Sequence, residues 1–232
     1  MKNIAIVIPA CNEEAEIAAC LTAVQRSVHE LYQAVNTDHI DVKTYVVLDS
    51  CIDQTMSLAQ QFNVQLLCCD FRCVGKSRDY GIRHAITQGC DWICCTDADS
   101  TVHQDWLSSM LVQQPVEMIC GVVDVIDWQQ LSESCKSQYL KHYQDVMHHQ
   151  HIHGANLSFS ADLYQKLNGF QALHNHEDVD LVQRAQHLGA DILWSNLTRV
   201  TTSSRLNARA TAGFAHFLST LEQQHNMSSV EF

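Results

Sequence analysis

Short, β-prone apolar segments alternate with helical patterns through the first hundred residues of the chain. The first segment, Ile4–Ile8, stops at Pro9, and apolar residues then recur at helical spacing from Ile17 to Val35. Further strands are predicted at Thr44–Leu48, Val64–Cys69 and Asp91–Thr96, and further helices at Met56–Phe62 and Lys76–Gln88. Such alternation implies right-handed crossovers and a mostly parallel sheet with helices on both faces. The sequence therefore predicts an α/β fold.

The pattern becomes less regular after Trp106. We expect strands at Met118–Ile126 and Asn156–Ser160 and helices at Glu133–His149, Ala161–Leu167, Val179–Leu188 and Ala208–Gln224. No linker rich in Pro, Gly or Ser divides the 232 residues, which lie near the upper size of a single hydrophobic core. One domain over residues 1–232 is the expectation.

Composition excludes several classes of protein. Lys and Arg total 14 against 26 Asp and Glu, so the formal charge of -12 argues against nucleic acid as a partner. The sequence contains no run of about 18 uncharged apolar residues, so we expect no integral membrane segment. The N-terminal run lacks a signal-peptide cleavage site, and the 11 cysteines are odd in number and show no CxxC spacing. We therefore expect a soluble, cytoplasmic protein with reduced thiols.

Polar and acidic residues follow three of the predicted strands. In a parallel sheet the ligand crevice lies beyond the carboxyl ends of the strands, so these positions are informative. They are Asn12, Glu13 and Glu14 after the first strand, Asp49, Ser50 and Asp53 after the second, and Asp97, Asp99 and Ser100 after the fourth. For any one residue, a turn or helix cap is as good an explanation as function. Three such clusters at one rim favour a site.

The Asp97-Ala98-Asp99 segment is the sharpest of these signals. Two carboxylates one residue apart at a strand end can point to the same side and share a hard cation. Such oxygens suit Mg²⁺ or Mn²⁺, which commonly takes substrate phosphate oxygens as further ligands. A DxD motif is frequent by chance, and its position after an apolar strand gives it value.

Five segments taken together resemble the family 2 glycosyltransferases. They are Ile8–Glu14, Leu48–Thr55, Gly75–Arg78, Asp97–Asp99 and His176–Leu181, and the resemblance spans about residues 4 to 190. It implies a single-domain GT-A-type fold that moves a sugar from a UDP- or GDP-linked donor to an unknown hydroxyl acceptor, with inversion. Residues 1–100 would form a nucleotide-binding half that ends in the DxD motif, and residues 101–232 an acceptor-binding half.

The resemblance also implies roles for individual residues. Pro9, Asn12, Glu13 and Asp49 would hold the nucleoside, Arg78 would face the nucleotide, and Asp97 and Asp99 would hold the metal and the donor diphosphate. Glu177-Asp178 would supply the base, and we favour Asp178 as the base and Glu177 as an orienting residue. From spacing alone, both are equally well explained as caps of a helix N-terminus. Leu48, Asp79 and Gln54 depart from the family pattern, and these departures bear on recognition of the base of the nucleoside.

Further residues form a second tier of candidates. The resemblance places Gly154, Ala155 and Asn156 near the donor sugar and acceptor, and His176 adjoins the proposed base. Arg205 would stabilise the leaving diphosphate from a loop, with ordinary surface charge an equal alternative. The histidines between His148 and His153 suit either a transition-metal site or a solvated helix end, of which we favour the second.

Two other functions compete with sugar transfer. A nucleotidyltransferase has a similar sheet but usually opens with a Gly-rich loop, and Pro9–Glu14 contains no glycine. A non-catalytic sugar-nucleotide or metal-binding protein would be favoured by loss of Asp97, Asp99 or Asp178, and all three are present. The sequence is compatible with a homo-oligomer and names neither the sugar nor the acceptor.

Overall fold

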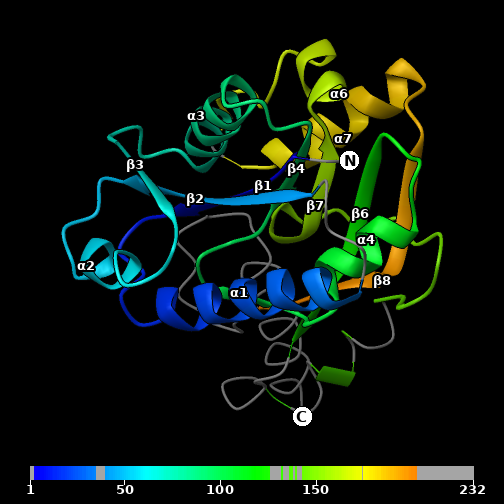
Figure 1. Ribbon diagram of the computed structural model, residues 1–232. Coiled ribbons are helices and arrows are strands. Elements are labelled where there is room, and N and C mark those ends of the chain that lie inside the picture. Colours follow the sequence, from blue (N-terminus) through cyan, green and yellow to red (C-terminus); the bar gives the residue numbers. More distant parts are fainter. Residues whose placement is uncertain are drawn as a thin grey trace, which may run out of the picture.

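The computed structural model describes residues 3–34, 40–125, 132, 136–137, 139, 143–173 and 175–202. Within these residues eight strands form one sheet in the order β3-β2-β1-β4-β7-β6-β8-β5 (Figure 1). The strands are β1 (Asn3–Ala10), β2 (Asp41–Asp49), β3 (Gln65–Cys69), β4 (Trp92–Cys95), β5 (Ser100–Val102), β6 (Met118–Val125), β7 (Leu157–Ser160) and β8 (Ile192–Thr202). The helices are α1 (Ile17–Ala34), α2 (Thr55–Ala59), α3 (Val74–Thr87), α4 (Trp106–Val112), α6 (Ala161–Lys166) and α7 (Glu177–Leu188), with a 3₁₀ turn at Gly154–Asn156.

The first half of the sheet is parallel. β1 pairs with β2 on one side and with β4 on the other, and β2 pairs in turn with β3. Because these strands run in the same direction, the loops that follow β1, β2 and β4 all leave from one edge of the sheet. The DxD motif therefore lies beside the loops that carry the other acidic clusters.

The second half of the sheet is mixed. β7 is antiparallel to both β4 and β6, β6 is parallel to β8, and β5 closes the edge antiparallel to β8. A register shift between Gly121 and Val122 interrupts the β6–β8 ladder. The pairing of β5 with the end of β8 brings Ser100, which directly follows the DxD motif, opposite Thr202.

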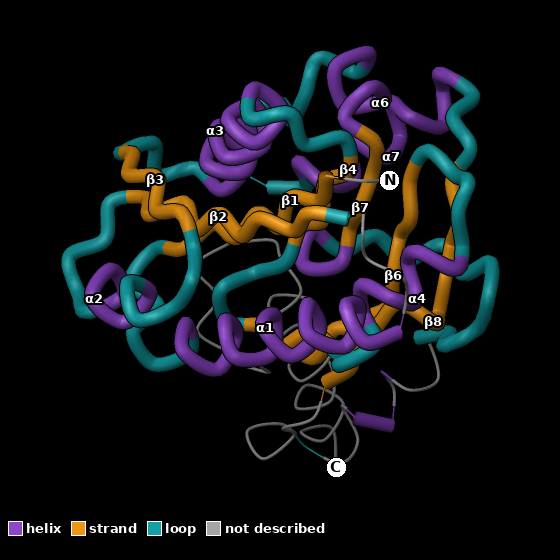
Figure 2. Tube along the Cα trace, viewed as in Figure 1, coloured by secondary structure: helices purple, strands orange, loops and turns teal. Residues whose placement is uncertain are grey.

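Helices cover both faces of the sheet, as Figure 2 shows with α1 along one side and α3 on the other. Alternate residues of β1 enter different cores: Ile4, Ile6 and Ile8 pack with α1 and α4, whereas Ala5 and Val7 pack with α3, α6 and α7. At Gly81 in α3, an added Cβ would lie 2.6 Å from a methyl of Val47, so this glycine permits close packing on the sheet.

The structure confirms the predicted α/β class and corrects parts of the second half. The predicted helix at 133–149 is contradicted over 143–149, where the described residues form bends and turns. β5, α4 and β8 were not predicted, and α7 begins two residues earlier than expected, at Glu177. The predicted helix Ala208–Gln224 lies outside the described residues.

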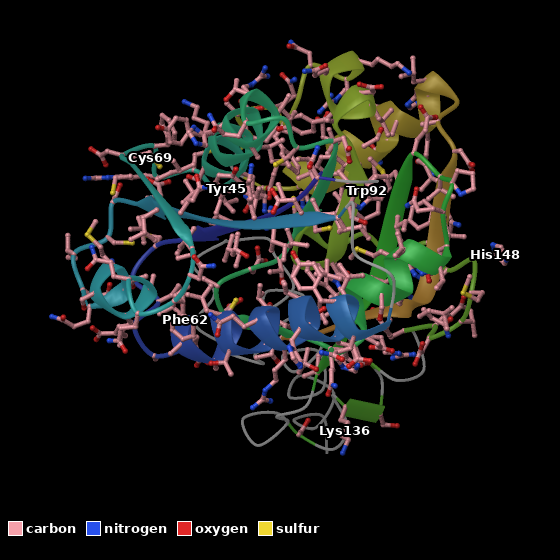
Figure 3. All side chains as sticks on the ribbon, in the orientation of Figure 1. Tyr45, Phe62, Cys69, Trp92, Lys136 and His148 are labelled. Atoms are coloured by element: carbon pink, nitrogen blue, oxygen red, sulfur yellow. The ribbon has the colours of Figure 1, made fainter. Side chains whose placement is uncertain are left out.

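The described cysteines are all free thiols, and several of them, such as Cys94 and Cys95 in β4, are packed in the core. In the part of the chain that the structure describes, no helix combines the length and the apolar character needed to cross a membrane. Figure 3 shows Trp92 of β4 inside the molecule, with Cys69 and His148 near its opposite ends.

Candidate active site

Hydrogen bonds join the loops after β1 and β2 into one unit. The side chain of Asn12 accepts a hydrogen bond from the backbone of Ile52 at 2.8 Å, and the backbone N–H of Glu13 donates to Thr55 Oγ1 at 2.7 Å. Gln54 donates its backbone N–H to the carboxylate of Glu14 at 3.0 Å. The structure therefore uses Asn12 and Glu14, expected at a ligand site, at least partly to hold the two loops together.

Two of the predicted nucleoside contacts lie at the end of β1. Pro9 is buried within the strand. The carbonyl of Glu13 accepts the backbone N–H of Ile17 at 2.9 Å, which starts α1. Asp53 accepts the backbone N–H of Thr55, the first residue of α2, at 3.0 Å. The loops after β1 and β2 are thus held mainly by hydrogen bonds to the first residues of α1 and α2, with Glu13 half-buried beside them.

Asp49, at the end of β2, is buried and surrounded by donors. Its Oδ1 accepts backbone N–H groups from Phe71 at 2.8 Å and Arg72 at 2.9 Å, and its Oδ2 accepts from Cys73 at 3.1 Å and from Ser77 Oγ at 2.6 Å. Burial would raise the pKa of Asp49, but these hydrogen bonds outweigh it and lower the pKa below its ordinary value. Asp49 therefore organises the loop that leads into α3.

Arg78 lies near the start of α3 and joins two halves of the site. Its side chain is only 4% exposed, and it donates from Nη2 to Asp97 Oδ1 and from Nη1 to Glu177 Oε1. Asp97 follows β4, and Glu177 begins α7. Burial disfavours the charged guanidinium, but Asp97 and Glu177 raise the pKa of Arg78 above its ordinary value. Arg78 is therefore a permanent internal cation turned away from solvent.

The guanidinium is enclosed by close neighbours. An added Cβ at Gly154 would lie 2.6 Å from Arg78 Nη1 and 2.8 Å from Cζ, so the space beside this glycine belongs to the guanidinium. The ring of Phe170 lies on another side, with its centroid 6.0 Å from Arg78 Cζ. A glycine at position 154 therefore leaves room for the Arg78 guanidinium, which any larger residue would displace.

The Glu177-Asp178 pair has two different environments at the start of α7. Glu177 is 5% exposed, and its burial raises its pKa, with Arg78 opposing the shift. Asp178 is half-buried; its Oδ2 accepts the backbone N–H of Gly154 at 2.7 Å, and its Oδ1 accepts that of Val179 at 2.8 Å. The ion-paired Glu177 is thus the inner carboxylate, and Asp178 is the more accessible one.

The DxD carboxylates lie next to this cluster. Asp97 is one-third exposed beside Arg78, and Asp99 is half-buried next to Ser100, whose hydroxyl donates to it at 3.3 Å. The thiol of Cys20 in α1 donates to the carbonyl of Asp97 at 3.4 Å, so the helix that follows the β1 loop contacts the DxD motif. Burial raises the pKa of Cys20, and the charges of Asp97, Asp99 and Glu13 raise it further. The rims after β1 and β4 therefore converge.

Whether these residues suit a divalent cation depends on their donor set. No group of three or more His, Cys, Asp or Glu side chains in the described residues could hold a metal ion. Two carboxylates do suit a Mg²⁺ or Mn²⁺ ion whose remaining ligands are water and substrate phosphate. Asp97 and Asp99 therefore fit a metal that is shared with a diphosphate, and do not fit a cage made by protein alone.

Some second-tier residues have other roles. Asn156 is 1% exposed; its Nδ2 donates to the carbonyls of Val122 and Thr198 at 2.7 and 2.8 Å, and its Oδ1 accepts from Trp106 Nε1 at 2.9 Å. The expected place of Asn156 near the donor sugar and acceptor stays a prediction, and its side-chain donors and acceptor are occupied inside the protein.

Three further second-tier residues differ in accessibility. Ala155 is buried, and His176 is an exposed residue at the N-cap of α7 with a positive φ of 61°. Arg205 lies outside the described residues. Only His176 of the three therefore offers a described, accessible side chain beside Asp178.

The histidine cluster is an aromatic stack. Tyr143 and His151 stack with ring centroids 4.1 Å apart, and Tyr143 Oη lies 3.2 Å from His153 Nε2. His149 is buried, stacks on His151 and meets the edge of Trp194. The favoured solvated helix end is therefore wrong for His149, His151 and His153, whose rings pack together, whereas His148 is exposed.

Sequence reasoning missed three residues of this site. Ser77 binds Asp49, Phe170 flanks Arg78, and Cys20 lies near the acidic rim. Ser77 directly precedes Arg78 in a segment already singled out, so it could have been found. Phe170 and Cys20 are apolar-type residues in a loop and a helix, and nothing in the sequence connects them to this site.

Comparisons with known proteins identify a family. The sequence model of "Glycosyl transferase family 2" matches residues 5–166 of this chain. No curated protein sequence matches the chain. The match covers the segments from β1 to α6 and therefore includes the DxD motif, Arg78 and Gly154.

Solved structures resemble the whole fold. S. aureus TarS 1–349 in complex with UDP has a TM-score of 0.66 at 14% identity, covering 99% of this chain and 72% of that one. The mannosyltransferase PcManGT from Pyrobaculum calidifontis, in complex with GDP-Man and Mn²⁺, has a TM-score of 0.59 at 14% identity, covering 99% of this chain and 64% of that one. M. tuberculosis glucosyl-3-phosphoglycerate synthase, in complex with Mn²⁺, UDP and glucosyl-3-phosphoglycerate, has a TM-score of 0.58 at 17% identity, covering 99% of this chain and 79% of that one.

At these identities the likeness is one of fold. The chain spans 44% of a longer TarS chain, so some of these proteins carry segments that have no counterpart here. The expected GT-A type of α/β fold is confirmed by these neighbours. The chain belongs to glycosyl transferase family 2.

Proposed function

We propose that this glycosyltransferase takes a sugar from a UDP- or GDP-linked donor and transfers it, with inversion, to a hydroxyl group of an acceptor. The observation that carries the proposal is the cluster of Asp97, Arg78, Glu177 and Asp178, which brings the DxD motif and the start of α7 together. The family favours sugar transfer over nucleotidyl transfer or simple binding. Neighbours of the same fold that were solved with UDP or GDP-Man support a nucleotide-linked donor.

On the donor side, the chain would bind the nucleotide along the edge formed by the loops after β1, β2 and β4. Asp97 and Asp99 would hold Mg²⁺ or Mn²⁺ against the diphosphate, and two neighbours solved with Mn²⁺ support this choice. The metal would neutralise charge on the departing diphosphate. The acidic edge needs such a cation, because carboxylates alone would repel a diphosphate.

On the acceptor side, Asp178 would act as the general base. Its carboxylate would take the proton from the acceptor hydroxyl while that oxygen bonds to the anomeric carbon. The bond from this carbon to the diphosphate oxygen would break, and the electron pair would leave with the diphosphate. Gly154, whose backbone N–H donates to Asp178 Oδ2 at 2.7 Å, would orient the carboxylate. The partial exposure of Asp178 lets an acceptor reach its carboxylate, whereas Glu177 is enclosed.

The test is release of nucleoside diphosphate from a panel of UDP- and GDP-sugars, measured with Mn²⁺ and candidate acceptors, or with water as a slow acceptor. Asp178→Asn should keep the fold and donor affinity but lower turnover by about two to four orders of magnitude, the usual contribution of a positioned base. The near-isosteric change removes the proton acceptor, but it also turns an amide N–H toward one of the two backbone N–H groups that Asp178 accepts, so Tm is measured beside turnover to show that the fold is kept.

Asp180→Asn is a matched control, because Asp180 lies in the same helical turn and pairs with Arg184. It should turn over like the wild type. Undiminished turnover in Asp178→Asn together with an inactive Glu177→Gln would reverse the two roles. If both variants kept full activity, the pair would be only a helix cap.

A further inference from the structure

Arg78 has its hydrogen-bonding groups directed into the protein. A residue that contacts a nucleotide must present its donors to the crevice, yet the Arg78 side chain is 4% exposed and donates to Asp97 and Glu177. We infer that Arg78 is a positioning residue, which couples the donor side to the acceptor side by holding Asp97 and Glu177 with one guanidinium. This inference rests on the proposed function, since it assigns how the two sides of that site are joined.

The guanidinium is planar and rigid, and this suits the role. Its two terminal nitrogens make separate ion pairs with carboxylates that are 80 residues apart in sequence, one after β4 and one at the start of α7. Such a fork fixes the angle between its partners, which a single ammonium cannot do. The geometry of Arg78 therefore sets the position of α7 relative to the DxD motif.

Arg78 also decides which of the two α7 carboxylates can serve as base. Glu177 is enclosed by its ion pair, and its side chain also approaches Gly75, where an added Cβ would lie 3.1 Å from Glu177 Cγ. Asp178 instead accepts the backbone N–H of Gly154. Pairing Arg78 with Glu177 thus leaves the neighbouring Asp178 to face the acceptor.

Gly154 links the guanidinium to Asp178 directly. The space that a Cβ would occupy lies 2.6 to 2.8 Å from three atoms of the Arg78 guanidinium, and the same residue donates its backbone N–H to Asp178. A shift of Arg78 would therefore move Gly154, and with it the Asp178 carboxylate. A misplacement of about 1 Å in a catalytic geometry can cost roughly 100-fold in rate.

The experiment compares Arg78→Lys with Arg83→Lys, a matched control on the same helix whose arginine makes an exposed ion pair with Asp79. We measure kcat at saturating donor, donor Kd by calorimetry, and Tm. Arg78→Lys should lower kcat about 10- to 100-fold and leave donor Kd within about 3-fold, because the cation stays but its fork is lost. Arg83→Lys should match the wild type in kcat and Kd.

Gly154→Ala provides a second, independent perturbation, because φ at this glycine is not in the left-handed region and the three atoms nearest to the added methyl group all belong to the guanidinium. It should also lower kcat and not Kd. If it acts through Arg78, the double variant should be no more than about twofold slower than Arg78→Lys alone, as expected for coupled sites. The single variant Gly154→Ala keeps the inference testable if Arg78→Lys folds poorly.

Three results would overturn the inference. A donor Kd raised more than about 10-fold with unchanged kcat would show that Arg78 contacts the nucleotide. A lowered Tm with unchanged kcat would show a structural role only. Multiplicative losses in the double variant would show that Gly154 acts independently of Arg78. Failure of the proposed function is distinct from all three, because then the wild-type protein itself would neither bind nor turn over a nucleotide sugar.

Discussion

At the scale of single residues, Asp49 shows how a rim carboxylate can be committed to the protein itself. Both of its oxygens accept backbone N–H groups of the loop before α3, and Oδ2 also accepts the hydroxyl of Ser77. The resemblance assigns this residue to the nucleoside, and that role stays a prediction. A nucleoside base that binds here would have to donate to Asp49 oxygens that already accept hydrogen bonds from the protein.

Asp49→Asn should lower the free energy of unfolding by about 1 to 3 kcal/mol, because the new amide turns an N–H toward buried donors. Chemical denaturation measures this, and calorimetry with UDP and GDP measures any separate effect on binding. Asp70→Asn is the control, since Asp70 is an exposed carboxylate that accepts from Ser50 nearby, and it should leave stability unchanged. Weaker nucleotide binding by Asp49→Asn at unaltered stability would instead assign Asp49 to the nucleoside.

At the scale of elements, the segment 143–153 is held by neutral imidazoles. Burial lowers the pKa of His149 and His151 and lowers that of His153 to about 3, and neighbouring imidazoles add to the shifts of His149 and His153. The segment is tied to β8, since the backbone N–H of His148 donates to the carbonyl of Trp194 at 2.8 Å. Protonation of the stack would therefore loosen a wall next to Gly154.

Stability should fall as pH is lowered through the histidine range. An unfolded histidine binds a proton below a pKa of about 6.5, whereas His153 in the folded protein does not until about pH 3, so the unfolded state binds more protons between these values. Each histidine that stays neutral in the folded protein lowers the free energy of unfolding by up to about 1.4 kcal/mol per pH unit in that window. His153→Gln, which stays neutral, should reduce the difference in unfolding free energy between pH 7.5 and 5.5.

His187→Gln is the control for this prediction, because His187 is an exposed residue on α7. It should keep the wild-type pH dependence. Chemical denaturation at both pH values gives the comparison. An unchanged pH dependence in His153→Gln would mean that carboxylates, and not this stack, govern acid stability.

At the scale of the whole molecule, the net negative charge couples nucleotide binding to metal binding. With a formal charge of -12, the protein repels a bare diphosphate, and its described residues hold no metal cage of three or more ligating side chains. We therefore expect a diphosphate and a divalent cation to bind together at the DxD edge.

Mutual dependence of the two ligands is the expected result. UDP or GDP should raise Tm only with Mg²⁺ or Mn²⁺ present, and the cation alone should raise it little. Binding at 100 times Kd stabilises the native state by about 2.7 kcal/mol, which thermal unfolding detects readily. Asp99→Asn should abolish the part of the Tm increase that depends on the metal. Equal stabilisation by nucleotide with and without EDTA would contradict the shared metal site.

The first half of the fold was predictable because its information is local. Apolar periodicity and polar residues at strand ends placed β1 to β4 and the loops that follow them close to their observed positions. β8 was missed because its eleven residues pair with both β6 and β5, and a strand stabilised by such distant partners leaves little local signal. The helix predicted over 143–149 failed because ring stacking and contacts with β8 override helix propensity.

The sequence by itself determined the α/β class and the kinds of group at the site: the DxD carboxylates, the Arg on α3 and the acidic pair on α7. Only the tertiary structure decided how these groups divide their roles. Whether Arg78 faces a ligand or Glu177, and whether Asn156 is free or bonded to Val122, depends on side chains brought together from distant elements. Burial and ion pairing are properties of that three-dimensional contact, and local sequence spacing does not encode them.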